Sequence, residues 1–224
     1  DGTTTDYVTG LTPSTVYGNP TSYSTGKYNL AAVFNTTPGS STSGLQYTVS
    51  SLGLTTFSIA FWVQPLSTIP VASGNQRFLF FNDTSGSNFF WIGFNTNSTT
   101  PNFYGQNPSG GTPLQTVGLN VLPPAMTQNT WLHLVWTVSA NGQYACYVNG
   151  VSYSVNPTSL YSSQGVSGNP FTVSNPLKYI YVANQGGGQA AYCSVDDLRI
   201  YNTALSAAQV QAVYATGGMP RRVA

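Results

Sequence analysis

The sequence predicts an all-β fold, a two-sheet antiparallel sandwich with one short C-terminal helix. Up to about residue 205, short runs of β-branched and aromatic residues alternate with clusters of Gly, Pro, Asn and Ser, a pattern typical of a sandwich or barrel. Asn141-Gly142 and Asn149-Gly150 are dipeptides favoured in type I′ hairpin turns. Segments 57–63 and 131–138 are apolar on both of their alternating faces, which indicates central strands of a two-sheet sandwich.

The strands follow from the same alternation and from the turn residues between them. The two Asn-Gly turns predict a three-stranded meander across 131–155. The expected strands are 28–34, 45–50, 57–64, 78–82, 89–94, 131–139, 143–148, 151–155, 179–183 and 192–201. Segments 97–128 and 156–176 are rich in Pro, Gly, Ser and Asn, and we expect long functional or disordered loops there.

One segment near the end of the chain has complete helix signals. Ser206 fits the N-cap, and Gln209 is placed to close a capping box. Leu205 and Val210 have the spacing of a hydrophobic staple, and Gly217 is placed to end the helix. We therefore divide the chain into residues 1–26, an N-terminal arm or edge strand, a single domain at 27–217, and a tail at 218–224.

Charged side chains are scarce in this 224-residue chain. They make up 5% of it, against roughly a quarter in ordinary soluble proteins, glutamate does not occur, and the net charge is +1. Nucleic acid is not expected as a partner, because Arg221-Arg222 is the only adjacent basic pair. No apolar run reaches the roughly 18 to 20 residues that span a bilayer. Attached sugars or burial in a larger assembly would explain how so neutral a surface stays soluble.

Four motifs in order resemble one family. FSIAFWVQP (57–65), WLHLVWTV (131–138), GQYACYVNGV (142–151) and VDDLRIYNTALSAAQV (195–210) are similar to strands and the closing helix of laminin-G-like, concanavalin A-like lectin-glucanase domains. The resemblance covers about residues 27–217 and implies a jelly-roll sandwich. The Ser/Thr/Asn-rich style and GGMPRRV at 217–223 are similar to versions in surface proteins of large DNA viruses and other microbial surfaces. We therefore expect an extracellular, cell-surface or virion-surface location.

Catalysis is not expected. Glycosidases of this family carry two glutamates around an aspartate on one strand, and this chain has no glutamate. Asp196 and Asp197 are neighbours in an expected strand, so their side chains should point to opposite faces and form no acid–base pair. The lone His133 lacks the Gly-x-Ser-x-Gly elbow of a nucleophilic triad, and the family has a non-catalytic histidine at that position.

The resemblance also implies a calcium ion, because related domains often bind one with an aspartate of the closing pair. Asp196 or Asp197, together with Asp1 or Asp6 and nearby carbonyls, would form the site. The alternative is that one aspartate accepts backbone N–H bonds while the other pairs with Arg199 or faces water.

Carbohydrate recognition needs aromatic faces for sugar rings and amides for hydroxyls. The candidate residues are Trp91, Asn95, Tyr104, Tyr161, Asn184 and Gln185. The alternative is that the aromatic side chains are core residues and that the glycines at 186–188 only turn a hairpin. The sequons at Asn35, Asn82 and Asn97 are candidate glycosylation sites. Cys146 and Cys193 lie in expected strands, either as buried thiols or as one inter-strand disulfide.

Two functions remain open at this point. The first is a non-catalytic jelly-roll module for carbohydrate binding and adhesion, with glycans as partners. The second is a structural subunit of a glycosylated fibre, filament or coat, which would assemble with like subunits through the arm at 1–26 and through sandwich surfaces.

Overall fold

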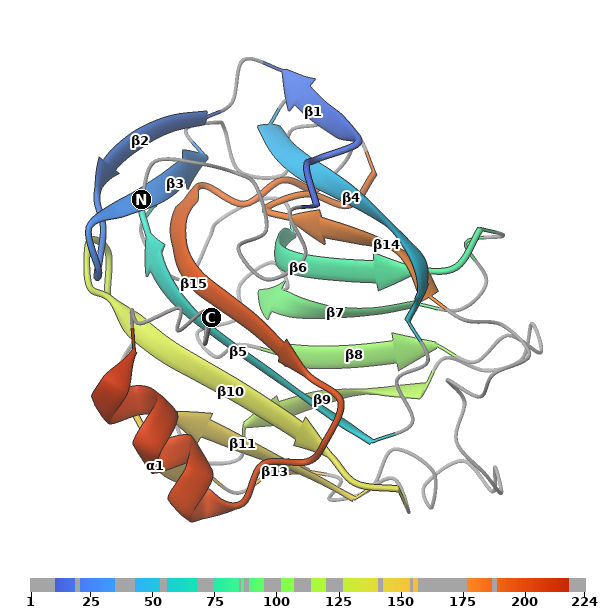
Figure 1. Ribbon diagram of the computed structural model, residues 1–224, viewed down its shortest axis with the longest axis vertical. Helices are drawn as coiled ribbons and strands as arrows, with labels where there is room; N and C mark the ends of the chain where they lie inside the picture. Colours follow the sequence, from blue (N-terminus) through green and yellow to red (C-terminus); the bar gives the residue numbers. More distant parts are fainter. Residues whose placement is uncertain are drawn as a thin grey trace, which may run out of the picture.

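The computed structural model describes most of the chain. The described residues are 11–18, 21–34, 43–52, 56–67, 75–84, 86, 89–94, 102–106, 114–119, 127–140, 143–153, 155–156, 177–186 and 189–217. They form two antiparallel sheets and one helix, α1 (Ala207–Thr216), as the sequence predicts. Figure 1 shows α1 lying beside β10 and β11.

The first sheet contains eight of the described strands. In spatial order they are β1 (Thr15–Gly18), β4 (Ser43–Leu52), β14 (Leu177–Val182), β6 (Gln76–Asn82), β7 (Phe89–Phe94), β8 (Asn102–Gln106), β9 (Leu114–Leu119) and β13 (Val155–Asn156). Each neighbouring pair is antiparallel.

The second sheet contains seven of the described strands. In spatial order they are β12 (Val151–Tyr153), β11 (Tyr144–Val148), β10 (Leu132–Val138), β5 (Phe57–Pro65), β15 (Cys193–Tyr201), β3 (Leu30–Phe34) and β2 (Thr21–Thr25). The predicted meander is present as β10, β11 and β12. Its second turn has left-handed backbone at Asn149 (φ 51°) and Gly150 (φ 78°), as a type I′ turn requires.

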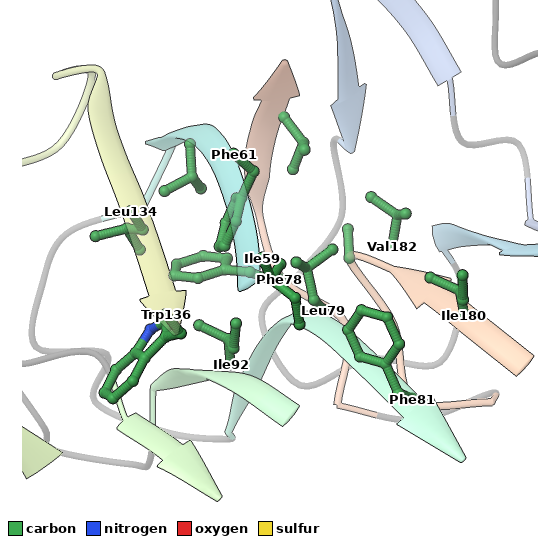
Figure 2. Close-up of a cluster of buried hydrophobic side chains, with 14 of the residues drawn as sticks. Ile59, Phe61, Phe78, Leu79, Phe81, Ile92, Leu134, Trp136, Ile180 and Val182 are labelled. Carbon is green, nitrogen blue, oxygen red and sulfur yellow. The ribbon is translucent and has the colours of Figure 1, made fainter. Parts of the chain in front are cut away.

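The core lies between the two sheets. β5 and β10 contribute Ile59, Phe61, Leu134 and Trp136, which face side chains from β6, β7 and β14 in Figure 2. The facing side chains that Figure 2 labels are Phe78, Leu79, Phe81, Ile92, Ile180 and Val182. Each fully buried large side chain contributes about 1.5–3 kcal/mol, so this layer is the main source of stability.

The helix is fixed at both ends by the residues that predict it. Ser206 accepts the Gln209 backbone N–H, and the Gln209 side chain accepts the Ser206 N–H at 2.8 Å, so the capping box is complete. Leu205 and Val210 are both buried against Ala60 and Val135 on the outer face of the seven-stranded sheet. Gly217 is the C-cap.

The structure has strands in one segment expected as a loop, and edge strands in the segment expected as an arm or an edge strand. Within 97–128, the structure has strands β8 and β9, which extend the eight-stranded sheet. Within 1–26, β1 pairs with β4 and β2 pairs with β3, so this segment supplies edge strands to both sheets. These strands are short and rich in Gly, Ser, Thr and Asn, and pairing with a neighbour stabilises them where local propensity is weak.

The disulfide alternative is wrong, since Cys146 and Cys193 are free buried thiols. They lie in β11 and β15, which are separated by β10 and β5 in the same sheet. Three strand spacings amount to about 14 Å. A disulfide requires Cα atoms within about 7 Å, so the sheet order excludes the bond.

Candidate functional site

Aromatic side chains cover part of the outer face of the eight-stranded sheet. Phe80, Trp91 and Tyr181 form a buried cluster there, on β6, β7 and β14. Their sequence neighbours Phe81, Phe90, Ile92, Ile180 and Val182 belong to the central core, so strand alternation separates the two sets. Partly buried Tyr17, Phe89 and Tyr179 pack around the cluster. We call these six residues the outer aromatic cluster.

Ring contacts hold the outer aromatic cluster together. The Phe80 ring stacks on Phe89 at 5.5 Å between centroids and meets Tyr181 edge-on at 5.6 Å. Tyr17 and Tyr179 each lie 6.3 Å from Tyr181. Burial raises the pKa of Tyr181 to about 12, so its phenol stays protonated at neutral pH. The three buried rings therefore form an uncharged layer, and the partly buried Tyr17, Phe89 and Tyr179 are its accessible members.

A buried arginine borders this cluster. The Arg77 guanidinium lies 3.5 Å from the centroid of the Trp91 ring, and the residue is 5% exposed. Its Nη1 donates to the Phe94 carbonyl at 3.1 Å, and its backbone N–H donates to the Gln189 carbonyl at 3.0 Å. A desolvated cation over an aromatic ring contributes about 2 kcal/mol. Arg77 thus joins β6 and β7 to the loop that carries Gln189.

The loop at 183–190, between β14 and β15, lies against the same face. Ala183, Gly186 and Gln189 have left-handed backbone, with φ of 58°, 60° and 54°. A Cβ added at Gly186 would lie 3.6 Å from the Tyr181 ring, so the loop runs alongside it. The side-chain oxygens of Gln185 and Gln189 are buried, and neither has a hydrogen-bond partner in the described part of the chain.

The structure brings some of the predicted glycan-binding residues together. Trp91 is in the outer aromatic cluster, Gln185 is in the adjoining loop, and β8 places Tyr104 opposite Trp91 in the strand register. Asn184 is fully buried, and its Nδ2 donates to the Ser43 carbonyl at 2.5 Å, so it anchors the loop to β4. Asn95 and Tyr161 lie outside the described residues.

Sequence reasoning missed Arg77 and Tyr181 as members of this site. The charge on Arg77 beside the run FLFF was a usable signal, because a cation at the start of an apolar strand needs a partner. Tyr181 gave no local signal. Of the candidate glycosylation sites, Asn82 is the last residue of β6, half-buried with its Oδ1 buried, while Asn35 and Asn97 fall outside the described residues.

The paired aspartates lie on the other sheet, at a β-bulge. The register between β15 and β5 shifts between Asp196 and Arg199, and Asp197 has a φ of 49°. Val195 and Leu198 both contact the core, so neither intervening aspartate points into it. The expectation that the two side chains point to opposite faces of a regular strand is therefore wrong.

Each aspartate has a protein partner. Asp196 Oδ2 accepts the Tyr28 backbone N–H at 2.8 Å, and Asp197 Oδ1 accepts from Arg199 Nε at 2.7 Å. Burial raises the pKa of Asp196, and the N–H groups of Tyr28 and Asp197 act in the opposite direction. The described residues contain no cluster of three His, Cys, Asp or Glu side chains that suits a metal. Asp6 lies outside them, so calcium binding stays a prediction.

His133 is enclosed by aromatic rings beneath α1. Its ring centroid lies 5.1 Å from that of Trp62 and 5.7 Å from that of Tyr214, and the residue is 1% exposed. Burial, with a smaller contribution from the Arg199 charge, lowers its pKa to about 4. His133 is therefore neutral at physiological pH and packs as part of the helix-docking surface.

The comparisons with known proteins agree with this architecture. The family model of the concanavalin A-like lectin/glucanases superfamily matches residues 38–211, and the chain belongs to that superfamily. No curated protein matches the chain. In the part of the chain that the structure describes, no helix has the length and apolar character needed to cross a membrane.

Similar solved structures are distant in sequence. Domain 4 of an extracellular arabinanase from Geobacillus stearothermophilus, in complex with arabinotriose, is 20% identical, with a TM-score of 0.61 over 95% of this chain and 93% of that chain. The binding domain of botulinum neurotoxin serotype G is 14% identical, with a TM-score of 0.66 over 93% and 47%. A pentraxin from Limulus polyphemus is 15% identical, with a TM-score of 0.57 over 86% and 84%. At such low sequence identities, the similarity to these structures shows a shared fold and nothing further.

Proposed function

We propose that this chain is a non-catalytic carbohydrate-binding module that acts outside the cell or on a virion surface. The observation that carries the proposal is the contact of the outer aromatic cluster with Arg77, which lies over Trp91, and with the amide-bearing loop at 183–190, where Gly186 adjoins Tyr181 and the Gln189 carbonyl accepts from the Arg77 backbone. Aromatic faces bind the apolar side of sugar rings, and amides bind their hydroxyls.

The comparisons support this class of function. The arabinanase domain was solved with arabinotriose, and other similar structures are binding domains of toxins. Catalysis is not part of the proposal, because the sequence contains no glutamate and its two neighbouring aspartates are engaged with Tyr28 and Arg199.

A glycan array followed by calorimetry tests the proposal. We expect the purified domain to bind at least one oligosaccharide, and arabino-oligosaccharides should be included. Tyr179→Ala, in the outer aromatic cluster, should weaken binding about fivefold, for a loss of about 1 kcal/mol. Tyr23→Ala, a half-buried tyrosine in the edge strand β2 of the other sheet, is the matched control. Absence of binding across the array with and without calcium would sink the proposal.

The second candidate function is self-assembly into a fibre, filament or coat. It is favoured by the placement of β1 and β2, because both come from the N-terminal segment and each lies at the edge of a different sheet. β2 contains no charged residue, and charge is one of the features that protect edge strands from pairing with another chain. Light scattering on protein from its natural source would detect the assembly. A strict monomer across a concentration series would count against it.

A further inference from the structure

We propose that the loop at 183–190 recognises a neutral, hydroxyl-rich sugar ring through the amide oxygens of Gln185 and Gln189, without a metal ion. This inference rests on the proposed function and specifies the chemistry of its ligand. Three features of the described residues carry it: two amide oxygens without partners, the strained backbone of the loop, and the charge on Arg77.

The amide oxygens define what the ligand must supply. A buried oxygen that lacks a hydrogen bond is destabilising, and both Gln185 and Gln189 carry one. An amide oxygen only accepts, so the missing partners are donors. Sugar hydroxyls are donors, whereas an ionised carboxylate or sulfate is not. The pair therefore favours a neutral polyol over an acidic group. The two oxygens are buried, but both residues are half-buried, so side-chain rotation is sufficient to expose an amide oxygen to solvent.

The described backbone of the loop is strained near both of its ends. Ala183 and Gln189 are non-glycine residues with left-handed backbone, a conformation that is unfavourable for residues with a Cβ atom. Bonds from Ala183 N–H to Phe78, from Ala191 N–H to Ala183, and from Arg77 N–H to Gln189 hold this conformation. Gly186 is exposed. Strain held in this way is common where a loop is pre-organised for a ligand.

Arg77 argues against a metal ion in the same loop. Its guanidinium is nearly buried over Trp91, and its backbone N–H occupies the Gln189 carbonyl that a cation would otherwise use. Calcium requires several oxygen ligands, usually with carboxylates, and a fixed positive charge nearby opposes it. The loop is therefore expected to recognise its ligand through amide groups, without a metal ion.

The test uses an array of neutral oligosaccharides and their uronic-acid counterparts, then calorimetry with the best-bound neutral sugar. We expect binding that EDTA leaves unchanged. Gln185→Leu and Gln189→Leu, which remove the acceptors, should each raise the Kd about fivefold. Gln185→Glu and Gln189→Glu keep oxygen acceptors and should bind within about twofold of wild type. The control is Gln128→Leu. Gln128 is exposed, its side chain donates to the Leu66 carbonyl, and it is remote in sequence from the loop at 183–190.

The outcomes separate this inference from the proposed function. If the wild type binds a sugar but the Leu variants bind equally well while folding normally by circular dichroism, the inference is wrong and the proposed function stands. Loss of sugar binding in EDTA, or binding restricted to uronic acids, would also show that the inference is wrong. In both cases the proposed function would still stand. If the wild type binds no sugar, the proposed function fails and the inference falls with it.

Discussion

The carboxylate of Asp196 accepts a hydrogen bond from the backbone N–H of Tyr28 at 2.8 Å, across 168 residues of sequence. The bond ties the closing strand β15 to the turn that precedes β3. Gly26 lies in the same turn, and a Cβ there would come within 2.6 Å of Asp196 Oδ2. The first aspartate of the closing Asp-Asp pair therefore has a structural partner in the N-terminal part of the domain.

Replacing Asp196 should destabilise the fold. In Asp196→Ala the Tyr28 N–H loses its acceptor, and we expect the free energy of unfolding to fall by about 1–3 kcal/mol in urea titrations. Asp196→Asn retains an oxygen acceptor and should lose less than half of that. Equal stability of Asp196→Ala and wild type would show that the bond contributes nothing.

Calcium should leave the Tm of the domain unchanged, because both closing aspartates already have protein partners. Differential scanning calorimetry with millimolar calcium, and then with EDTA, measures this. A calcium-dependent rise in Tm that disappears in Asp196→Asn or Asp197→Asn would instead establish the calcium site that the family resemblance implies.

His133 should make stability depend on pH in the acidic range. Its folded-state pKa of about 4 lies below its ordinary value of 6.5, so the unfolded chain binds the proton more readily. Stability is then complete above about pH 6.5 and is lost as the pH falls toward 4, by on the order of 3 kcal/mol. His133 is the only histidine in the chain, so urea titrations of wild type and His133→Gln between pH 4 and 7 isolate the effect. Parallel pH profiles for the two proteins would contradict it.

Gly93 should tolerate no side chain. A Cβ there would overlap the Gln76 carbonyl oxygen, a backbone atom that cannot rotate away. Gly93→Ala should cost about 3 kcal/mol or more, or prevent folding. Gly86→Ala, at an exposed position with a φ of 72° and no atom within 4 Å of the added Cβ, should cost about 1–2 kcal/mol. Similar losses in the two variants would contradict the packing argument.

Cys146 and Cys193 should be inert in the native protein. Burial raises the pKa of both thiols, so neither forms the reactive thiolate at neutral pH. We expect no reaction with a thiol reagent until urea unfolds the chain, and then two equivalents. Mass spectrometry under non-reducing conditions should find both thiols free. Rapid labelling of the folded protein would show that one of these strands opens.

Local pattern accounted for most of the architecture. The alternation of Phe57, Ile59, Phe61 and Val63 against Ser58, Ala60 and Trp62 predicted two opposite faces of β5, because strand side chains alternate with a period of two, and the structure places the first set in the core. The turn at Asn149-Gly150 and the cap at Ser206 were predicted on equally local grounds. The bulge at Asp197 was not, because an extra residue in a strand is set by its partner's register.

Within the candidate site, Trp91 and Gln185 were predicted from residue type. The contact of Arg77 with Trp91 and with the Gln189 carbonyl was not, since the loop at 183–190 is distant in the sequence from both β6 and β7. The cysteines show the same limit of local sequence information. The sequence left open whether Cys146 and Cys193 are buried thiols or a disulfide, and the order of strands excluded the disulfide.

The sequence by itself determined the fold class, which residues share a face of the central strands, the meander at 131–155 and the closing helix. Each depends on residues within one or two turns or strands of each other, where periodicity and capping act directly. The tertiary structure alone decided that Arg77, Trp91, Tyr181 and Gln189 share one surface, and that both cysteines stay apart. Those relationships arise from the order of strands in the two sheets, which pairing between distant segments sets and no local pattern specifies.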